Sequence, residues 1–354
     1  MADRSSSGAT STDPLPAEPR SDGEVRARKR SHGEAIDHLA GRRVLVTGGG
    51  GFIGSNLAAW LAPHAEVTVL DDFTSGAREN VSDLGVNVET ADVRDREAVA
   101  AAVDGQDVLV HMAAMAGVQR TIDNPVDTLE VNVEGTRTVL ETALEADVDR
   151  VLFTSTSEMY GDLSDPPYRE DGPIAPKTNY AVAKAVNERY VRAYCEQAGM
   201  SYTIVRYFNV YGPNQDGSTD GYVVPKFIRR ALADESIPVY GSGEQSRDFT
   251  FVDDAIDGTV RALGPAGRNG TFNLGTGIET SVRTLADRVA EVVGGGRVEH
   301  VEDPRPYRVE RRCADVTRAR DRLGYEPRVP LREGIGRVAE SVAPAGGEAR
   351  SGDR

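Results

Sequence analysis

Lysine is nearly absent from this chain. Four of its 41 lysine and arginine residues are lysines, at positions 29, 177, 184 and 226. The chain also has 56 aspartates and glutamates, so its formal net charge is −15. A surface with this excess of negative charge repels phosphate backbones and anionic headgroups. We therefore expect no sequence-independent binding to nucleic acid and no attachment to an anionic membrane surface.

Cysteines and long apolar runs are scarce too. Cys195 and Cys313 are too few for a disulfide framework, and no cysteines and histidines share the spacing of a metal site. No apolar run approaches the ~20 residues of a membrane-spanning helix. The basic residues at positions 26–30 are not followed by the apolar segment of a secretory signal. These absences predict a cytoplasmic enzyme or binding protein that holds no metal.

The two ends of the chain differ in composition from its middle. Residues 1–42 and 342–354 are rich in small and charged residues and are predicted to be disordered tails. Between them, short β-branched runs alternate with segments of helical periodicity, which predicts an α/β fold with a doubly wound parallel sheet. The predicted strands are Arg43–Thr47, Glu66–Leu70, Asn87–Thr90, Val108–His111, Val151–Thr154, Thr203–Tyr207 and Thr271–Leu274, and the predicted helices include Gly54–Leu61, Val126–Glu145 and Tyr180–Ala198.

A glycine-rich segment follows the first predicted strand. Gly48, Gly51 and Gly54 lie between this strand and the next helix, with Phe52 and Ile53 between the last two glycines. The absence of side chains lets the backbone approach a pyrophosphate, and the helix N-terminus supplies N–H donors and a positive dipole end. The segment predicts a dinucleotide-binding loop, with a purely structural glycine turn as the alternative.

Acidic residues end the second and third predicted strands. Asp71 stands about twenty residues beyond the glycine loop. A carboxylate there accepts hydrogen bonds from ribose hydroxyls and repels a 2′-phosphate, and no arginine follows it directly, so NAD is favoured over NADP. Asp92 either reaches the adenine amino group or caps a helix N-terminus.

Tyr180 and Lys184 are four residues apart in a predicted helix, so their side chains share one face. A compact ammonium beside a phenol favours the phenolate, which predicts that Tyr180 acts as a base near neutral pH. The alternative is an incidental pair on a surface helix.

Hydroxyls and a carboxylate crowd the turn after the fifth predicted strand. Thr156 and Glu158 lie at the carboxyl end of this strand, where open α/β sheets bind their ligands. An ordinary turn rich in serine and threonine is the alternative.

Taken in order along the chain, these motifs resemble the extended short-chain dehydrogenase/reductases, which are NAD-dependent epimerases, dehydratases and decarboxylases of nucleotide sugars. The resemblance spans residues 43–337. Its further motifs are Arg206–Pro213, Val239–Asp254, Asn273–Gly277, Pro304–Pro306 and Leu323–Pro327.

The resemblance implies a role for each site residue. Thr156 would hold the sugar 4-hydroxyl, Tyr180 would take its proton, and NAD would accept the hydride from C4. Lys184 would lower the pKa of the phenol and bond the nicotinamide ribose. The residues implied to contact NAD are Gly48, Gly51, Phe52, Ile53, Gly54, Asp71, Asp92, Tyr180 and Lys184. The nucleotide diphosphate would be gripped by Asn209, Arg247 and Arg305, because guanidinium forks match phosphate oxygens.

The resemblance also implies the domain organisation and the assembly. Residues 43–211, joined by 248–280, would form the NAD-binding Rossmann domain. Residues 212–247 and 281–341 would form a smaller, partly discontinuous α/β domain that binds the nucleotide sugar. The protein would be a homodimer, formed through helices that include Tyr180–Ala198.

Glu158 bears on which reaction follows the oxidation at C4. Simple 4-epimerases usually carry a small or uncharged residue at this position, whereas dehydratases and decarboxylases carry a glutamate that works near C5. The serine that precedes it, Ser157, resembles the sequence of the GDP-mannose dehydratases and the decarboxylases at this position. By contrast, Asn273–Ser281 and Gln119–Pro125 are more similar to bacterial and archaeal 4-epimerases. These segments narrowly favour a 4-epimerase of a UDP-glucose-like substrate over a 4,6-dehydratase or a UDP-glucuronate-type decarboxylase.

A non-catalytic reading is a redox sensor that binds NAD without changing a sugar. Such proteins typically lose the tyrosine or the lysine of the catalytic pair. This chain keeps both Tyr180 and Lys184, which disfavours the sensor.

Overall fold

The fold is built on one parallel sheet. The computed structural model describes residues 37–162, 165–215, 222–303 and 309–342. Seven strands are arranged in the order β11–β6–β5–β4–β1–β2–β3, and every neighbouring pair is parallel. They are β1 (Arg43–Thr47), β2 (Glu66–Asp71), β3 (Asn87–Thr90), β4 (Val108–His111), β5 (Arg150–Thr156), β6 (Ser201–Tyr207) and β11 (Gly270–Leu274). All seven predicted strands are confirmed.

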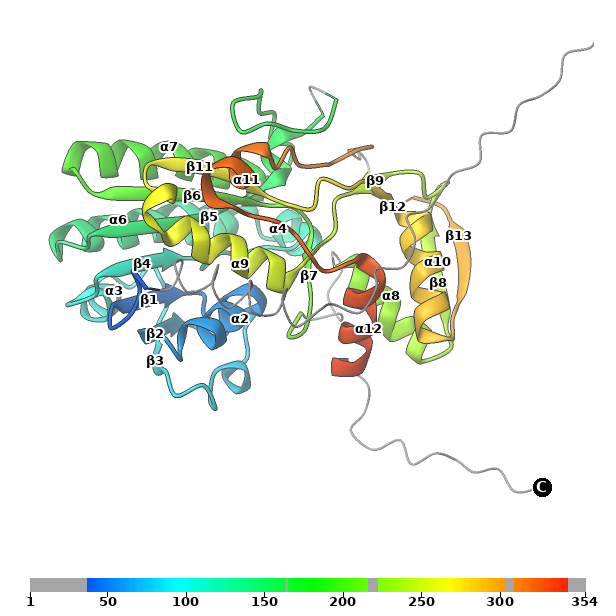
Figure 1. The fold of residues 1–354 in the computed structure, drawn as a ribbon, viewed down its shortest axis with the longest axis horizontal. Helices are drawn as coiled ribbons and strands as arrows, with labels where there is room; N and C mark the ends of the chain where they lie inside the picture. The colour runs from blue at the N-terminus through cyan, green and yellow to red at the C-terminus, as the bar shows by residue number, and fades with distance from the viewer. Residues whose placement is uncertain (1–36, 163–164, 216–221, 304–308, 343–354) are drawn as a thin grey trace, which may run out of the picture.

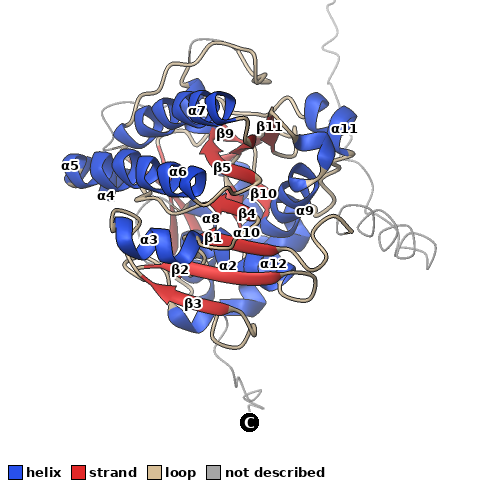
Figure 2. Cartoon of the chain, turned by 90° about the vertical axis from the view of Figure 1, so that its left-hand side faces the viewer, coloured by secondary structure: helices blue, strands red, loops and turns tan. Residues whose placement is uncertain are grey.

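Helices cover both faces of this sheet, as its buried strands require. Every residue of β5 is buried, which is typical of a parallel strand enclosed on two sides. One face is covered by α3 (Arg96–Val103), α6 (Gly135–Glu145) and α7 (Asn179–Ala198), and the other by α2 (Phe52–Leu61), α9 (Val252–Leu263) and α11 (Thr317–Leu323) (Figures 1 and 2). The predicted doubly wound α/β fold is therefore confirmed. No helix in the described ranges has both the length and the apolar character needed to cross a membrane.

A smaller group of elements stands apart from the main sheet, at the right of Figure 1. Its two strands are parallel, β8 (Ser236–Tyr240) and β13 (Arg297–Val301). Around them pack α8 (Val223–Leu232), α10 (Val282–Val293) and α12 (Leu331–Val342). Because α9 and β11 of the main unit intervene in the chain, this smaller α/β unit is discontinuous. The domain limits inferred from the sequence remain a proposal.

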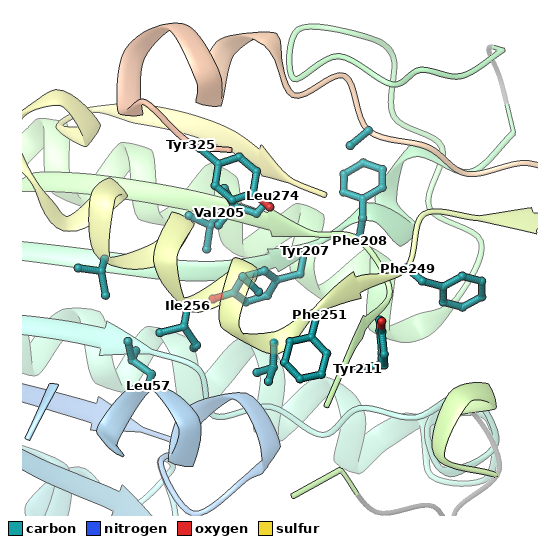
Figure 3. Close-up of a cluster of buried hydrophobic side chains, with 14 of the residues drawn as sticks. Leu57, Val205, Tyr207, Phe208, Tyr211, Phe249, Phe251, Ile256, Leu274 and Tyr325 are labelled. Atoms are coloured by element: carbon teal, nitrogen blue, oxygen red, sulfur yellow. The ribbon is translucent and has the colours of Figure 1, made fainter. Parts of the chain in front are cut away.

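Short strands join the two units. The parallel pair of β7 (Val210–Tyr211) and β10 (Thr250–Phe251) follows β6 and precedes α9. The antiparallel pair of β9 (Ser246–Arg247) and β12 (Thr280–Ser281) lies nearer the small unit. Phe251 packs edge-on against Tyr211, with ring centres 5.5 Å apart, in the aromatic cluster of Figure 3. This packing fixes the segments that carry Asn209 and Arg247.

Two segments differ from the sequence prediction. The predicted helix 126–145 is continuous but not uniform: α5 (Pro125–Leu129) leads into a π-helical turn (Glu130–Glu134) before α6, and α4 (Val118–Asp123) precedes it. Residues 37–42 were predicted to belong to a disordered tail, but 37–41 form a turn and Leu39 is buried in the main core. The few apolar residues around Leu39 form a run too short to show a reliable periodicity, so the burial of this side chain could not be predicted. The remaining tail predictions, 1–36 and 343–354, lie outside the described residues.

Candidate active site

The glycine loop forms a close-fitting cradle at the carboxyl end of β1. Gly48 has φ +72°, which favours glycine, and a Cβ there would lie 2.6 Å from the Ala113 nitrogen. A Cβ at Gly54 would lie 2.1 Å from the Gly48 carbonyl oxygen. Gly51 donates its N–H to that same oxygen, and α2 begins at Phe52. The loop therefore turns directly into a helix N-terminus at the point where the strand order reverses, which fits a bound pyrophosphate.

Asp71 lies beside this cradle, at the end of β2. Its Oδ2 accepts a hydrogen bond from the Gly50 nitrogen at 2.9 Å, and its Oδ1 accepts one from the Phe73 nitrogen at 2.7 Å. Burial raises the pKa of Asp71, while these backbone hydrogen bonds act to lower it. A carboxylate has about four acceptor positions, so Asp71 can still accept a hydrogen bond from a ribose hydroxyl. The structure thus ties Asp71 to the glycine loop that was predicted to work with it.

Asp92 has a different environment. The Nε atom of Arg94 lies 3.0 Å from each of its carboxylate oxygens, and hydrogen bonds from Arg94 lower the pKa of Asp92 although burial opposes them. The N-terminus of α3 is capped by Asp95, which accepts hydrogen bonds from Glu97 and Ala98. Asp92 is therefore not the helix cap, and its contact with adenine remains a prediction.

Strand β5 and helix α7 bring the predicted catalytic residues together. Thr156 ends β5, and its Oγ1 accepts a hydrogen bond from the Glu158 nitrogen at 3.2 Å, which caps the 3₁₀ turn Ser157–Tyr160. Lys184 donates from Nζ to the carbonyl oxygen of Thr154 at 2.8 Å. The same Nζ lies 5.8 Å from the centre of the Tyr180 ring. The predicted pair therefore does share one face of α7, directly against the end of β5.

The charge states of this pair differ from the expectation. Burial lowers the pKa of Lys184 to about 7, against an opposing effect of the Glu188 carboxylate. The pKa of Tyr180 is raised by burial, and the charges of Glu158 and Tyr222 act in the same direction. The expected lowering of the phenol pKa by Lys184 is thus not what the structure shows. The ammonium group is directed at the Thr154 carbonyl, and burial makes its proton easier to lose.

Glu188 is a buried residue of the site region that the sequence reasoning missed. It stands four residues after Lys184, and its carboxylate pairs with the guanidinium of Arg206 on β6. Arg206 also donates to the hydroxyl of Tyr160 at 2.8 Å, and that hydroxyl donates to Asn273 Oδ1 at 2.6 Å. The network links α7 and β6 to the turn after Thr156. The repeated spacing of four residues from Tyr180 was the signal that could have revealed it.

The predicted substrate-binding residues are only partly described. Asn209 has φ +35°, and its Oδ1 is buried without a hydrogen-bond partner in the described part of the chain. Arg247 donates from Nη1 to the carbonyl oxygen of Ser246 at 2.6 Å. Buried acceptors without partners are rare in folded proteins and often mark a ligand contact. Asn209 therefore fits the role expected of it, whereas Arg305 lies outside the described residues.

With a nucleotide cradle at the switch point of the sheet and a tyrosine–lysine helix against β5, the chain has the architecture of the extended short-chain dehydrogenase/reductases. It belongs to the NAD dependent epimerase/dehydratase family, whose model matches residues 44–275. The cofactor of that family is NAD, in agreement with the prediction made from the glycine loop and Asp71.

Relatives with different activities are similar to this chain over nearly their whole length. The UDP-glucose 4-epimerase of Mycolicibacterium smegmatis is 39% identical over 84% of this chain and 97% of its own length. The UDP-N-acetyl-alpha-D-glucosaminuronate decarboxylase of Bacillus cytotoxicus is 34% identical over 83% of this chain and 95% of its own. The dTDP-glucose 4,6-dehydratase of Streptomyces venezuelae, solved with NAD bound, superposes with a TM-score of 0.78 at 33% identity, covering 84% of this chain and 96% of its own. The family of the chain is therefore clear. Its identities to these three relatives are comparable, at 33–39%, although the relatives catalyse three different reactions.

Proposed function

We propose that the protein is an NAD-dependent 4-epimerase of a nucleoside-diphosphate sugar of the UDP-glucose type. The observation that supports this most is the meeting of Thr156, Tyr180 and Lys184 at the carboxyl end of β5. These three groups are what oxidation of a sugar hydroxyl needs: a residue that holds the hydroxyl, a base and a nearby cation.

The roles of the three groups follow from their contacts. NAD, when bound, supplies a hydride acceptor with a positive charge on its nicotinamide ring. Thr156 uses its oxygen to accept from the Glu158 nitrogen, so its hydroxyl hydrogen can be donated to the sugar O4. Tyr180 takes the proton of the 4-hydroxyl. Because the pKa of Tyr180 is raised, this step needs positive charge beside the phenol, which Lys184 supplies in its protonated form.

Contacts with the nucleotide, away from the reacting sugar carbon, would supply binding energy. In the proposed complex Asn209 and Arg247 contact the diphosphate, with Arg305 as a further contact. Energy gained there positions the sugar over the reacting groups, which raises the rate rather than only the affinity.

A second candidate is a 4,6-dehydratase or a decarboxylase, and Glu158 is the observation that favours it. Its carboxylate is close enough to Tyr180 to affect the phenol electrostatically. A second acid–base group at this place is needed for chemistry beyond C4, and it is not needed for returning a hydride to C4. The epimerase is kept as the first proposal because Asn273–Ser281 and Gln119–Pro125 are more similar to 4-epimerases.

The reactions can be separated by the masses of their products. We would incubate the enzyme and NAD with UDP-glucose, dTDP-glucose, GDP-mannose and UDP-glucuronate, and analyse each mixture by mass spectrometry and chromatography. A new diastereomer of unchanged mass indicates an epimerase, loss of water a dehydratase, and loss of carbon dioxide a decarboxylase. Tyr180→Phe should abolish turnover and keep NAD binding, because only the proton acceptor is removed. Glu158→Gln should leave an epimerase largely active. Normal turnover by Tyr180→Phe would refute the proposed base.

We also propose that the protein is a cytoplasmic homodimer. On α7, Val182, Val186 and Tyr190 form an exposed stripe at four-residue spacing, with 45%, 37% and 46% of their surfaces accessible. Val126 and Leu129 of the adjacent α5 are also exposed. An apolar face of this kind is typical of a helix that packs against a second copy.

A further inference from the structure

Thr178 makes two contacts with one hydroxyl group. As the residue before α7, it accepts a hydrogen bond from the Ala181 nitrogen at 3.0 Å and so caps the helix. The same Oγ1 lies 3.1 Å from Oε2 of Glu158. Because an ionised carboxylate can only accept, the single hydroxyl hydrogen of Thr178 must point to Glu158. Its lone pairs then remain available for the Ala181 N–H, so both contacts are satisfied together.

Glu158 is thereby held by one of its two oxygens. Oε2 is engaged by Thr178, whereas Oε1 accepts no hydrogen bond from the residues that the structure describes. The side chain is half-buried and follows Thr156 by two positions in the 3₁₀ turn. Its charge acts on the Tyr180 phenol. The carboxylate therefore lies near the phenol, held from the first turn of the same helix α7, and one of its oxygens is left to accept a hydrogen bond.

We propose that Thr178 is a positioning residue that orients Glu158 so that its free oxygen accepts a hydroxyl of the bound sugar. This inference rests on the proposed function, because it takes the ligand of the site to be a nucleotide sugar. It does not depend on whether the product is an epimer, a dehydrated sugar or a decarboxylated one. A role limited to helix capping is the simpler alternative, and it predicts effects on stability alone.

Three substitutions separate capping from positioning. Thr178→Ser keeps both the acceptor and the donor. Thr178→Gly loses the hydroxyl but retains most of the capping preference, since glycine is nearly as good a helix cap as threonine. Thr178→Asp keeps a strong capping acceptor and replaces the donor to Glu158 with a like charge. Thr178→Asp also keeps the test decisive if Thr178→Gly loosens the first turn of α7.

The measurement compares the affinities for UDP-glucose and for UDP, by calorimetry on the NAD-loaded protein. UDP lacks the sugar, so it reports on the nucleotide site alone. We expect Thr178→Gly and Thr178→Asp to lower the affinity for UDP-glucose by roughly tenfold, which is the effect of losing one hydrogen bond to a charged group. The affinity for UDP should not change. Thr178→Ser should bind both ligands like the wild type. In turnover, the two weakened variants should show a raised KM.

The Glu158→Ala background tests whether Thr178 acts through Glu158. If it does, Thr178→Gly should have no further effect on UDP-glucose affinity in that background, whereas any loss of stability from a weakened helix cap would persist. Equal affinity of the wild type, Thr178→Gly and Thr178→Asp for UDP-glucose would overturn the positioning role and leave the proposed function intact. Failure of the wild type to bind UDP-glucose and the other nucleotide sugars would overturn the proposed function and this inference with it.

Discussion

Glu188 and Arg206 form a two-pronged ion pair inside the protein. Arg206 donates from Nε to Oε1 and from Nη2 to Oε2, each at 2.8 Å, and the side chains are 2% and 4% exposed. Burial acts to raise the pKa of Glu188, but the hydrogen bonds from Arg206 lower it, so the carboxylate is ionised. The pair spans the interface between the helix that carries Tyr180 and the sheet.

Removing one partner of this pair should be costly. Glu188→Ala leaves the buried guanidinium of Arg206 without its counter-charge, and we expect a loss of about 3–5 kcal/mol in the free energy of unfolding. Urea denaturation followed by circular dichroism would measure it. The control is Glu134→Ala, which breaks an exposed pair with Arg137 on α6 and should cost no more than about 0.5 kcal/mol. Similar losses in the two variants would contradict the importance of the buried pair.

Lys184 should make stability depend on pH. Its pKa is about 7 in the folded protein and 10.5 without burial, so between these values the unfolded chain binds the extra proton. Stability should therefore rise with pH from 7 to 10.5, by up to about 1.4 kcal/mol per pH unit. Lys184→Met removes this dependence on pH. The free energy of unfolding of the variant should therefore exceed that of the wild type most near pH 7. Urea denaturation at pH 7, 8 and 9 tests the slope, with Lys177→Met, in an exposed pair with Asp162, as the control. Parallel curves for the wild type and Lys184→Met would contradict the assignment.

Gly54 should tolerate no side chain. The Cβ of Gly54→Ala would lie 2.1 Å from the Gly48 carbonyl oxygen, so the glycine loop and α2 must separate. We expect the affinity for NAD to fall at least about tenfold, because the loop and helix N-terminus form the pyrophosphate cradle together. Fluorescence titration with NAD measures this. Gly336→Ala in α12 is the matched control: its nearest neighbour would be 3.9 Å away, and it should bind NAD normally with equal or slightly higher stability.

The exposed stripe on α7 should be needed for assembly. Val186→Glu places a charge in the middle of the proposed dimer surface, and burying that charge is unfavourable. By size-exclusion chromatography with light scattering, we expect the wild type to be a dimer and the variant to be a monomer. Leu232→Glu, at the end of α8, changes a similarly exposed residue and should remain dimeric. A dimeric Val186→Glu would argue for a different interface.

The main sheet could be predicted from the sequence because its strands are rich in β-branched residues and separated by helical periodicity, and all of them except the edge strand β3 are mostly buried. The connecting strands could not. β9, β10 and β12 have two residues each, which is too few to show alternation, and β8 contains Pro238. The π-helical turn at Glu130–Glu134 changes the hydrogen bonding within a continuous helical pattern, so composition does not reveal it.

The site was predictable where function depends on neighbours in the chain. The spacing of Tyr180 and Lys184 on one helix face is such a case. The contact between Thr178 and Glu158 was not predictable, because the chain between these residues, which are twenty positions apart, had to fold back before the two met. Charge states were also beyond sequence reasoning. A lysine next to a tyrosine suggests a lowered phenol pKa, but burial raises the pKa of Tyr180, and it also lowers the pKa of Lys184.

Helix α7 presents two different surfaces at once. Lys184 and Glu188 face the sheet, while Val182 and Val186 face outward, two positions away along the same backbone. A helix moves as a rigid rod, so a sequence change that tightens or loosens the outer surface also displaces Lys184 and Glu188 on the inner one. Attempts to engineer a monomeric or heterodimeric form through this helix should therefore be expected to alter substrate preference, and assembly and selectivity would have to be optimised together.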